Sequence, residues 1–396
     1  MQNFIFISPN FPSNYWRFCR ELKNDGFNVL GIGDCPYDDL TCEQKASMNE
    51  YYKVSTLENY DEVYRAVAFF TFKYGKIDYL ESNNEYWLER DAMLRTAFNI
   101  TTGFKQTDVK KIKYKSKMKK YFEKAGVKCA KYCLVKTLNT SKKFIESVGY
   151  PVIVKPDNGV GANDTYKLKN DAELENFFEN KPANVPYIME EYIEGEVHTY
   201  DAIIDSKGNP VFESGNVTAV SLMDTVNDKG NCLYYIVNEP EADLVEIGRK
   251  TVKSFNVKRR FIHFEYFRLT RDQRIGNKGD IVALEVNMRP AGGYTPDMFN
   301  YANSTDVYKI WADVMAFDKS EKPLGEKYFC AYAGRRDGLD FLYCEQEIID
   351  KYFMNLKAIC RIPDALAPAM GNTMYLANFK TKKELNEFYS DILKIK

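Results

Sequence analysis

The sequence predicts an N-terminal α/β domain with a doubly wound parallel sheet, then a larger α+β region, then a small C-terminal α+β segment. Short apolar runs alternate with helical patterns through about the first hundred residues, as in a parallel sheet flanked by helices. Beyond residue 150, long strand patterns follow one another, which is typical of antiparallel pairing. The length of 396 residues suits two or three compact domains rather than a single core.

The composition excludes several classes of function. Lysine and arginine number 55 against 56 acids, so the net charge of -1 gives no overall attraction to nucleic acid or an anionic membrane. The nine cysteines are irregularly spaced without a CxxC pair, so we expect reduced thiols and no zinc site. No run of about 18 apolar residues is present that would span a membrane. We therefore expect a cytoplasmic protein with no nucleic-acid and no membrane partner.

The first domain is expected to consist of alternating strands and helices. The turn after its first strand, 8–12, lacks the glycines that cradle a dinucleotide, so no NAD site is expected. The expected strands are 4–8, 27–32, 51–54 and 77–80, and the expected helices are 15–23, 57–74 and 86–98.

A lysine-rich segment follows, with nine lysines and two acids between residues 105 and 124. Met118, Phe122 and Ala125 recur at helical spacing, which predicts a helix with one buried face. Most of these lysines are therefore assigned to the solvated face of that helix rather than to a nucleic-acid patch. Lys115 is the exception, because it is part of the motif pattern described below.

Beyond this helix, longer strands replace the alternating units. The strand 151–155 ends at Lys155 and is followed by a glycine-containing loop, 157–162. After residue 322 we expect two or three strands and a helix near 381–393. The other expected elements are strands at 187–190, 197–204, 210–216, 261–269 and 281–287, and a helix at 171–179.

The strongest local signal for chemistry lies in the segment 281–289. Glu285 and Asn287 are two residues apart in a strand, so they point to the same face. If the hairpin is symmetric about Ile275, Glu265 lies directly across from Glu285. Facing carboxylates repel each other unless a cation lies between them, and a carboxylate with an amide oxygen suits Mg²⁺. The pattern favours a metal site over a surface acid pair.

Two further signals indicate a nucleotide site. Lys155 ends an apolar strand just before Gly159 and Gly161, where its ammonium and the loop N–H groups can reach the same phosphates. The segment 190–196 ends another strand and carries four carboxylates within seven residues. Each signal alone has a plain alternative, which is an ordinary tight turn for the first and a solvated acidic turn for the second.

In combination and in order, these motifs resemble the ATP-grasp superfamily, the fold of biotin carboxylase, carbamoyl phosphate synthetase and many carboxylate–amine ligases. The resemblance covers roughly residues 1–320. It implies a pre-ATP-grasp domain at 1–102, an ATP-grasp domain at 103–320 with lobes of about 128–192 and 195–320, and a C-terminal segment at 321–396. The matching segments are Lys115-Ser116-Lys117-Met118, Gly149-Tyr150-Pro151-Val152-Ile153-Val154-Lys155-Pro156, Gly159-Val160-Gly161, Glu190-Glu191-Tyr192-Ile193-Glu194-Gly195 and Leu284-Glu285-Val286-Asn287-Met288-Arg289.

The resemblance also implies a role for each motif. The implied ATP-binding residues are Lys115, Lys155, Gly159 and Gly161 at the phosphates, Glu190, Glu191, Tyr192 and Ile193 at the adenine hinge, and Glu196 at the ribose. Glu190 would accept a hydrogen bond from the adenine amino group. Glu265, Glu285 and Asn287 would bind two Mg²⁺ ions, with Mn²⁺ as an alternative, and Arg289 would stabilise the acyl phosphate. Gly292 and Gly293 would hold a substrate carboxylate through their N–H groups.

Three positions depart from the family pattern. Tyr114 replaces the Asp that often precedes the first lysine, and Ala162 and Asn163 stand where a Ser commonly follows the glycine loop. In the family, a ribose-binding Glu is usual at the first or second position after the glycine that corresponds to Gly195. Val197 occupies the second position, so the ribose is assigned to Glu196. Neither histidine is expected to be catalytic, and packing or a local hydrogen bond is expected for His198 and His263.

The resemblance implies a two-step ligase. A substrate carboxylate would attack the γ-phosphate of ATP to give an acyl phosphate, and an amine would displace phosphate to give an amide, with ADP released. The partners would be small-molecule carboxylate and amine substrates, and a homodimer is left open. The alternatives are an ATP-dependent phosphotransferase and a nucleotide-binding module without turnover. Arg335 and Arg336 either cap the site or form a solvated pair in a turn.

Overall fold

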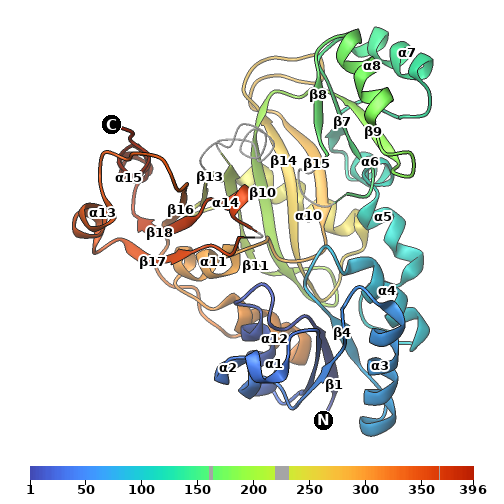
Figure 1. Cartoon of the computed structure of the whole chain (residues 1–396), viewed down its shortest axis with the longest axis vertical. Helices are drawn as coiled ribbons and strands as arrows, with labels where there is room; N and C mark the ends of the chain where they lie inside the picture. Colours follow the sequence, from blue (N-terminus) through green and yellow to red (C-terminus); the bar gives the residue numbers. More distant parts are fainter. Residues whose placement is uncertain (160–163, 219–231, 365) are drawn as a thin grey trace.

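The computed structural model describes residues 1–159, 164–218, 232–364 and 366–396. Figure 1 shows a long central sheet with the N-terminal domain below it, a small lobe above it and the C-terminal strands to one side. Within the described ranges, no helix is long and apolar enough to cross a membrane.

The N-terminal domain holds a four-stranded parallel sheet in the order β3-β2-β1-β4, which confirms the predicted doubly wound arrangement. β1 and β2 are buried along their whole length, as expected for parallel strands that are covered on both faces. The chain runs from β1 outward to β2 and β3 and then returns to β4 on the other side of β1, so the sheet has its topological switch point between β1 and β4. The elements are β1 (Asn3–Ile7), α1 (Trp16–Asn24), β2 (Asn28–Gly33), η1 (Tyr37–Asp39), α2 (Cys42–Ala46), β3 (Glu50–Lys53), α3 (Tyr60–Tyr74), β4 (Tyr79–Glu81) and α4 (Leu88–Ala97).

The small lobe is a four-stranded antiparallel sheet in the order β6-β9-β7-β8. One face carries Val152, Val154 and Met189, which pack against the two helices of the lobe. Lys155 and Glu190 alternate with these residues along β7 and β9, so they lie on the opposite face. The elements of the linker and lobe are η2 (Gln106–Asp108), α5 (Val109–Lys113), α6 (Lys115–Lys124), β5 (Lys128–Cys129), β6 (Tyr132–Leu134), α7 (Leu138–Val148), β7 (Val152–Pro156), β8 (Tyr166–Leu168), α8 (Asp171–Asn180) and β9 (Tyr187–Glu191).

The described residues include a ten-stranded sheet in the order β17-β18-β16-β13-β12-β10-β14-β15-β5, with β11 beside β10. Helix α10 covers one face, where Gly248 lies so close to the ring of Tyr200 that a Cβ would approach it to 2.3 Å. Val286 and Tyr266 are buried in the same core. The elements of the large lobe are β10 (Gly195–Ile204), β11 (Pro210–Ser214), β12 (Asn216–Thr218), β13 (Cys232–Ile236), α10 (Ala242–Phe255), β14 (Arg260–Leu269), β15 (Ile281–Asn287), α11 (Thr295–Asn303) and α12 (Val307–Phe317).

The C-terminal segment has the predicted three strands and terminal helix, and its strands continue the large sheet through the pairing of β13 with β16. Its elements are β16 (Phe329–Arg335), α13 (Glu345–Tyr352), β17 (Leu356–Arg361), α14 (Ala367–Met370), β18 (Thr373–Phe379) and α15 (Lys382–Ile392). Arg335 is buried, donates to the Ile392 carbonyl at 2.7 Å and lies 4.4 Å from the Phe341 ring. It is therefore a packing residue of this segment, and both predictions for Arg335 were wrong.

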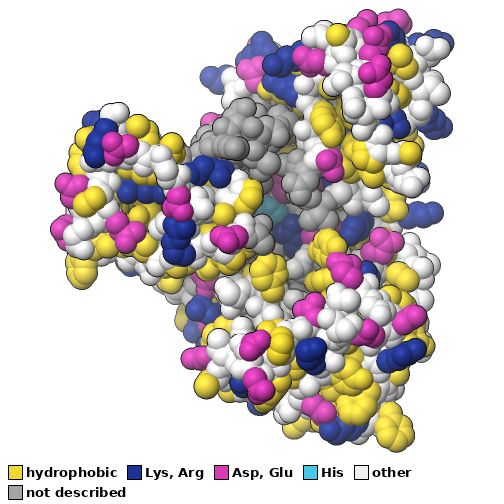
Figure 2. Space-filling view, viewed as in Figure 1, with side chains coloured by type: hydrophobic (Ala, Val, Ile, Leu, Met, Phe, Trp, Pro, Cys, Tyr) yellow, Lys and Arg dark blue, Asp and Glu magenta, His cyan; other side chains and the backbone are white. Residues whose placement is uncertain are grey.

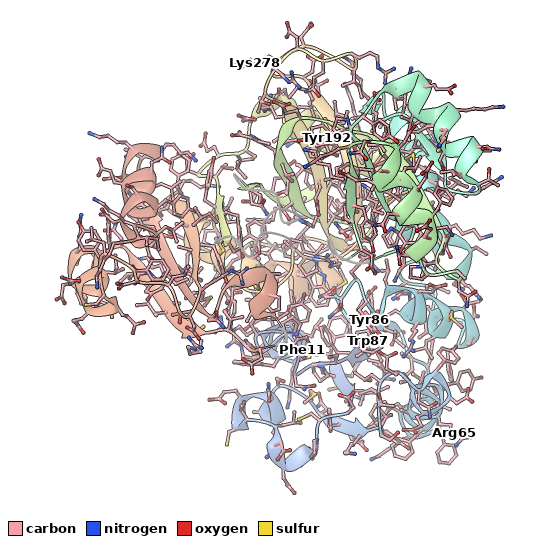
Figure 3. The ribbon with its side chains drawn as sticks, turned by 45° about the horizontal axis from the view of Figure 1, so that its top comes forward. Phe11, Arg65, Tyr86, Trp87, Tyr192 and Lys278 are labelled. Carbon is pink, nitrogen blue, oxygen red and sulfur yellow. The ribbon has the colours of Figure 1, made fainter. Side chains whose placement is uncertain are left out.

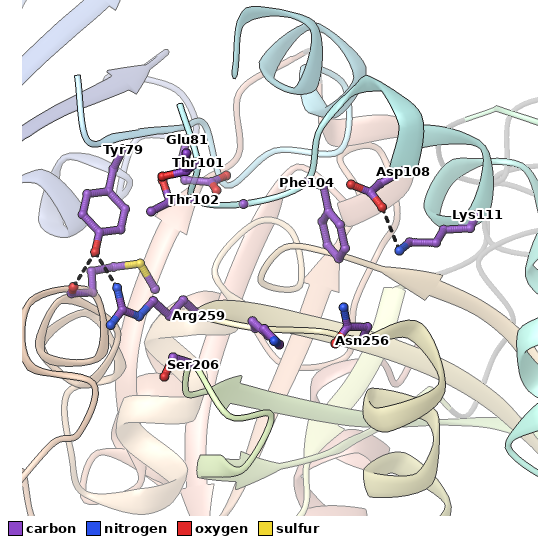
Figure 4. Close-up of a pocket in the computed structure, with 13 residues that line it drawn as sticks. Tyr79, Glu81, Thr101, Thr102, Phe104, Asp108, Lys111, Ser206, Asn256 and Arg259 are labelled. Carbon is purple, nitrogen blue, oxygen red and sulfur yellow. Dashed lines mark hydrogen bonds and ion pairs between the residues drawn. The ribbon is translucent and has the colours of Figure 1, made fainter. Parts of the chain in front are cut away.

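The N-terminal domain meets the large lobe at a seam that contains a cavity of about 320 Å³ (Figure 4). Tyr79 closes one side, because its hydroxyl accepts from Arg259 Nη1 at 2.8 Å and donates to the Met315 carbonyl at 3.2 Å. Lys111 and Asp108 form an ion pair of 2.8 Å on the other side. These contacts fix the orientation of the first domain relative to the central sheet.

Candidate active site

The predicted hairpin register is confirmed, because Glu265 pairs with Glu285 and His263 pairs with Asn287. A bulge at Leu284 breaks the pairing just beyond Glu285, and such bulges often redirect side chains beside active sites. Asn287 Nδ2 donates to Glu265 Oε1 at 3.1 Å and lies 3.5 Å from Glu285 Oε1. The three side chains predicted to bind metal therefore lie together on one face of the large sheet.

Lys115 approaches this group from helix α6. Its Nζ lies 3.2 Å from Glu285 Oε2 and donates to the Gly159 carbonyl at 3.1 Å. Burial opposes the charged ammonium, but Glu285 raises the pKa of Lys115 above its ordinary value. Burial likewise opposes the Glu285 carboxylate, and Lys115 and Lys155 lower its pKa. The predicted phosphate lysine and the predicted metal carboxylate therefore neutralise each other here.

Tyr114 is the N-cap residue of α6 but makes no side-chain hydrogen bond there, and Asp157 caps the helix instead. Asp157 Oδ1 accepts from the Ser116 amide at 2.7 Å, Oδ2 accepts from the Ser116 hydroxyl at 2.7 Å, and the Asp157 carbonyl accepts from the Lys115 amide at 2.8 Å. A carboxylate that satisfies free N–H groups at a helix N-terminus is stabilising. An acid from the end of β7 therefore supplies the cap that position 114 lacks.

A second charge cluster lies on the cleft-facing side of the small lobe. Glu190 lies between two lysines, with Oε1 2.5 Å from Lys119 Nζ and Oε2 2.7 Å from Lys155 Nζ. Burial alone would raise the pKa of Glu190, but Lys119 and Lys155 lower it to about 2. Both carboxylate oxygens are therefore engaged by ammonium groups.

His263 extends the large-lobe cluster toward β10. Its Nε2 lies 3.2 Å from Glu265 Oε1, and its Nδ1 lies 2.8 Å from Oδ1 of the fully buried Asp201. Burial alone would lower the pKa of His263, but the Asp201 and Glu265 carboxylates raise it to about 9. Thr199 donates to the other Asp201 oxygen. The expected hydrogen bond of His263 is made to Asp201, and its other ring nitrogen lies beside Glu265, one of the predicted metal ligands.

Arg289 lies at the junction with the N-terminal domain. Its Nε is 3.7 Å from Glu85 Oε2, and its Nη1 donates to the Pro290 carbonyl at 2.8 Å. Asn14 donates to the Gly293 carbonyl at 3.2 Å, so the loop after β1 holds the segment that contains Gly292 and Gly293. That segment immediately precedes helix α11, whose first turn contains Pro296 and the carboxylate of Asp297.

The remaining residues of the predicted nucleotide site have different surroundings. Ile193 packs into a small core with Ala130 and Leu269, and Tyr192 lies under the Lys167 ammonium at 3.9 Å. Glu191 accepts from the Lys131 amide at 2.6 Å and pairs with Arg274, so it ties the small lobe to the β14–β15 loop. Gly161 and residues 162–163 lie outside the described residues.

The structure does not bring Glu196 to the cluster. Glu196 pairs with Arg268, and Val197 pairs with Phe267, whereas Thr199 pairs with Glu265. Because alternate residues of a strand point to opposite faces, Glu196 lies on the α10 side and Val197 lies on the Glu265 side. The Glu196 carboxylate is 3.5 Å from His198 Nε2 on that side.

Three residues that contribute to the site were not predicted from the sequence. The assignment of most lysines to a solvated face was wrong for Lys119 and Lys113, which are buried. Lys119 lies four residues after Lys115, so it shares a helix face with it, and this spacing was an available signal. Glu85 gave no local signal, because Arg289 is far away in the sequence.

The donor set fits a hard divalent cation. Glu265, Glu285 and Asn287 supply carboxylate and amide oxygens, and turning the Asn287 amide would present its oxygen to a shared ion. Among the described residues no group of three or more His, Cys, Asp or Glu side chains forms a complete metal site. The protein ligands would therefore be few, as is usual for Mg²⁺ held partly by substrate phosphates.

On the face shown in Figure 2, basic, acidic and histidine side chains are visible between the lobes. Residues 112–293 match the family described as ATP-grasp domain. The match covers the segment that contains the motifs described above, which agrees with their resemblance to ATP-grasp proteins.

The chain is similar to particular members of this class. It is 25% identical over 234 residues to an L-arginine-specific L-amino acid ligase of Bacillus subtilis, covering 56% of this chain and 53% of that protein. It is 23% identical over 251 residues to a carbamoyl phosphate synthase large chain of Caldanaerobacter subterraneus subsp. tengcongensis, covering 59% of this chain and 22% of that one. The chain thus spans about half the length, or less, of these relatives. The crystal structure of an L-amino acid ligase from Bacillus licheniformis superposes with a TM-score of 0.72 at 15% identity, covering 99% and 97% of the two chains, which shows a shared fold.

Proposed function

We propose that this chain is an ATP-dependent ligase that activates a carboxylate as an acyl phosphate and joins it to an amine, releasing ADP and phosphate. The observation that carries the proposal is the convergence of Lys115, Glu265, Glu285 and Asn287 on one face within the ATP-grasp domain. Lys115 already pairs with Glu285 in this cluster, and phosphates and cations would replace these partners.

ATP would bind between the small lobe and the large sheet. Lys155 and Lys115 would turn from Glu190 and Glu285 to the phosphates, since both ammonium groups lie beside the loop that contains Gly159. This movement frees Glu190 Oε2 to accept from the adenine amino group, next to the backbone of residues 191–193. The side chain of Glu196 points to the other face of the sheet. The ribose would therefore bind to another residue of the segment that follows Gly195.

Glu265, Glu285 and Asn287 would hold two Mg²⁺ ions, with Mn²⁺ as an alternative. Bound there, the ions would offset the negative charge of the terminal phosphates during phosphoryl transfer. His263 donates toward Glu265 and so orients that carboxylate, as partners of metal ligands commonly do. Arg289 faces the same space and would stabilise the charge on the transferred group.

The carboxylate substrate would lie between Arg289 and the Gly292–Gly293 segment. Gly292 has open space where a side chain would be, and the segment leads into the N-terminus of α11. The open space would leave room for a carboxylate beside the backbone N–H groups of Gly292 and Gly293. Because a relative is named an L-amino acid ligase, amino acids are the first substrates to test.

The test is nucleotide product analysis with ATP, Mg²⁺ and an equimolar pool of the protein amino acids. We expect ADP and phosphate, peptides detected by mass spectrometry, and a hydroxamate when hydroxylamine traps the acyl phosphate. Without amino acids, turnover should be slow, because water does not replace a positioned carboxylate. AMP and diphosphate as products would overturn the proposal, and a phosphorylated end product would favour a phosphotransferase.

A further inference from the structure

The loops after β1 and β4 lie at the carboxyl ends of neighbouring parallel strands. In open α/β sheets, ligands bind outside the carboxyl ends of the strands at the topological switch point, which here lies between β1 and β4. The loop after β1 contacts Gly293 through Asn14, and the loop after β4 contacts Arg289 through Glu85. Both loops therefore contact residues that would hold the acyl phosphate or the carboxylate.

Buried polar atoms in these two loops lack hydrogen-bond partners. In the loop after β1 these atoms are Asn10 Oδ1 and Asn14 Oδ1, and in the loop after β4 they are Asn83 Nδ2 and Glu85 Oε2. Buried polar atoms are normally satisfied, so such a cluster calls for a missing partner. Three of the four are acceptors, which indicates that the partner is mainly a hydrogen-bond donor.

The loop that carries Glu85 is held firmly. Tyr15 donates to the Asn83 carbonyl at 3.1 Å, the Tyr86 amide donates to Asn84 Oδ1 at 3.0 Å, and Lys113 Nζ donates to the Glu85 carbonyl at 3.2 Å. Tyr86 and Phe11, both exposed, lie with Trp87 along the edge of the N-terminal domain in Figure 3. These three hydrogen bonds hold the loop around Glu85 in place.

Burial raises the pKa of Glu85, although Arg289 and Lys113 oppose the rise. A carboxylate with a raised pKa is a stronger base than an exposed one. An incoming ammonium would give Glu85 Oε2 the hydrogen bond that its 3.7 Å contact with Arg289 does not supply, and it brings a proton that it must lose before it can attack.

We propose that Glu85 binds the amine substrate and accepts its proton, so that the N-terminal domain supplies the nucleophile to a reaction centre on the large lobe. This rests on the proposed ligase function. The ammonium gives one proton to the Glu85 carboxylate, and the amine lone pair forms the new C–N bond at the acyl carbon. The C–O bond to phosphate breaks, and phosphate leaves with that electron pair. The second N–H proton is lost to water as the amide forms.

The test compares two nucleophiles in Glu85→Gln with the amino-acid pool as the probe. Hydroxylamine is uncharged at neutral pH and needs no proton acceptor, whereas amino acids arrive as ammonium ions. We expect peptide formation to fall at least tenfold while hydroxamate formation and the KM for ATP stay within about twofold of wild type. We also expect the residual peptide rate to rise with pH more steeply than in wild type, because free amine must come from solution.

Glu89→Gln is the matched control, since it removes the same charge one helical turn further on, where no ion pair forms among the described residues. Thermal unfolding of both variants checks that the fold is intact. Parallel loss of peptide and hydroxamate would overturn the proposal, because it would mean that Glu85 acts only by orienting Arg289. Unchanged peptide formation would also overturn it. If wild type forms neither product, the ligase function itself fails, which is a distinguishable result.

Discussion

The two charge clusters beside helix α6 have opposite balances. In the small lobe one carboxylate, Glu190, lies between Lys119 and Lys155. In the large lobe there are two carboxylates, Glu265 and Glu285, of which Glu285 pairs with Lys115, while His263 is already paired with Asp201. The first cluster therefore has a positive excess and the second a negative one. A polyanion bound with divalent cations is complementary to both at once, and neither cluster alone indicates this.

The largest effect of a substitution is expected at the large-lobe cluster. Glu285→Gln keeps the shape of the side chain and removes the charge that would hold the cations. Because a metal ion contributes several kcal/mol to transition-state stabilisation, we expect Mg²⁺-dependent ADP formation to fall about 10²–10³-fold or more. Wild-type ADP formation by this variant at limiting Mg²⁺ would contradict the metal assignment.

In the small-lobe cluster the larger effect is on stability. Lys119 is 2% exposed, so Lys119→Met leaves Glu190 buried with a single partner. Breaking a buried ion pair costs about 3–5 kcal/mol, and we expect the lower end because Lys155 remains. Urea unfolding measures this loss. In the double variant Lys119→Met/Glu190→Gln, stability should be partly restored, and a further loss instead would be inconsistent with the pairing.

Substitution of Lys155 is expected to change nucleotide binding rather than packing. A charge-assisted hydrogen bond is worth about 1.5–3 kcal/mol, so Lys155→Met should weaken ATP binding about tenfold or more. Isothermal titration calorimetry gives the affinity, and Lys117→Met, on the exposed face of α6, is the control. Equal affinities in the two variants would remove Lys155 from the phosphate site.

The Glu190 cluster also predicts a pH dependence. The lysines lower the pKa of Glu190 to about 2, so its contribution to stability is complete above the unfolded pKa and is lost as the pH falls toward 2. Between pH 5 and pH 3 this group should account for a loss of about 2 kcal/mol in the free energy of unfolding. The corresponding loss should be smaller in Glu190→Gln. If the two pH profiles ran parallel, the depressed pKa would be refuted.

The smallest effect is expected at Glu196. Because this residue lies on the α10 side of the sheet, Glu196→Ala should change the KM for ATP by less than about twofold. Steady-state kinetics of ADP formation tests this. A tenfold rise would restore Glu196 as a ribose ligand and would require the start of β10 to rearrange on binding.

Much of the fold was predictable, because the N-terminal units and the long hairpin follow simple periodicities. Glu265 was matched to Glu285 by assuming a symmetric hairpin, and the bulge at Leu284 shifts the register so that these two residues do pair. The correct facing of Glu196 was not predictable, because it depends on where β10 is aligned against β14. Glu85 and Asp157 act on residues distant in the sequence, and no local pattern encodes such contacts.

Lys115 contacts both lobes. Its backbone amide is bonded to Asp157 at the end of the small-lobe strand β7, whereas its ammonium contacts Glu285 on the large sheet. Separation of the lobes must therefore break the Lys115–Glu285 contact. Phosphates that attract the ammonium weaken the same contact, so the arrival of the nucleotide and the freedom of the lobes to move are coupled through one side chain.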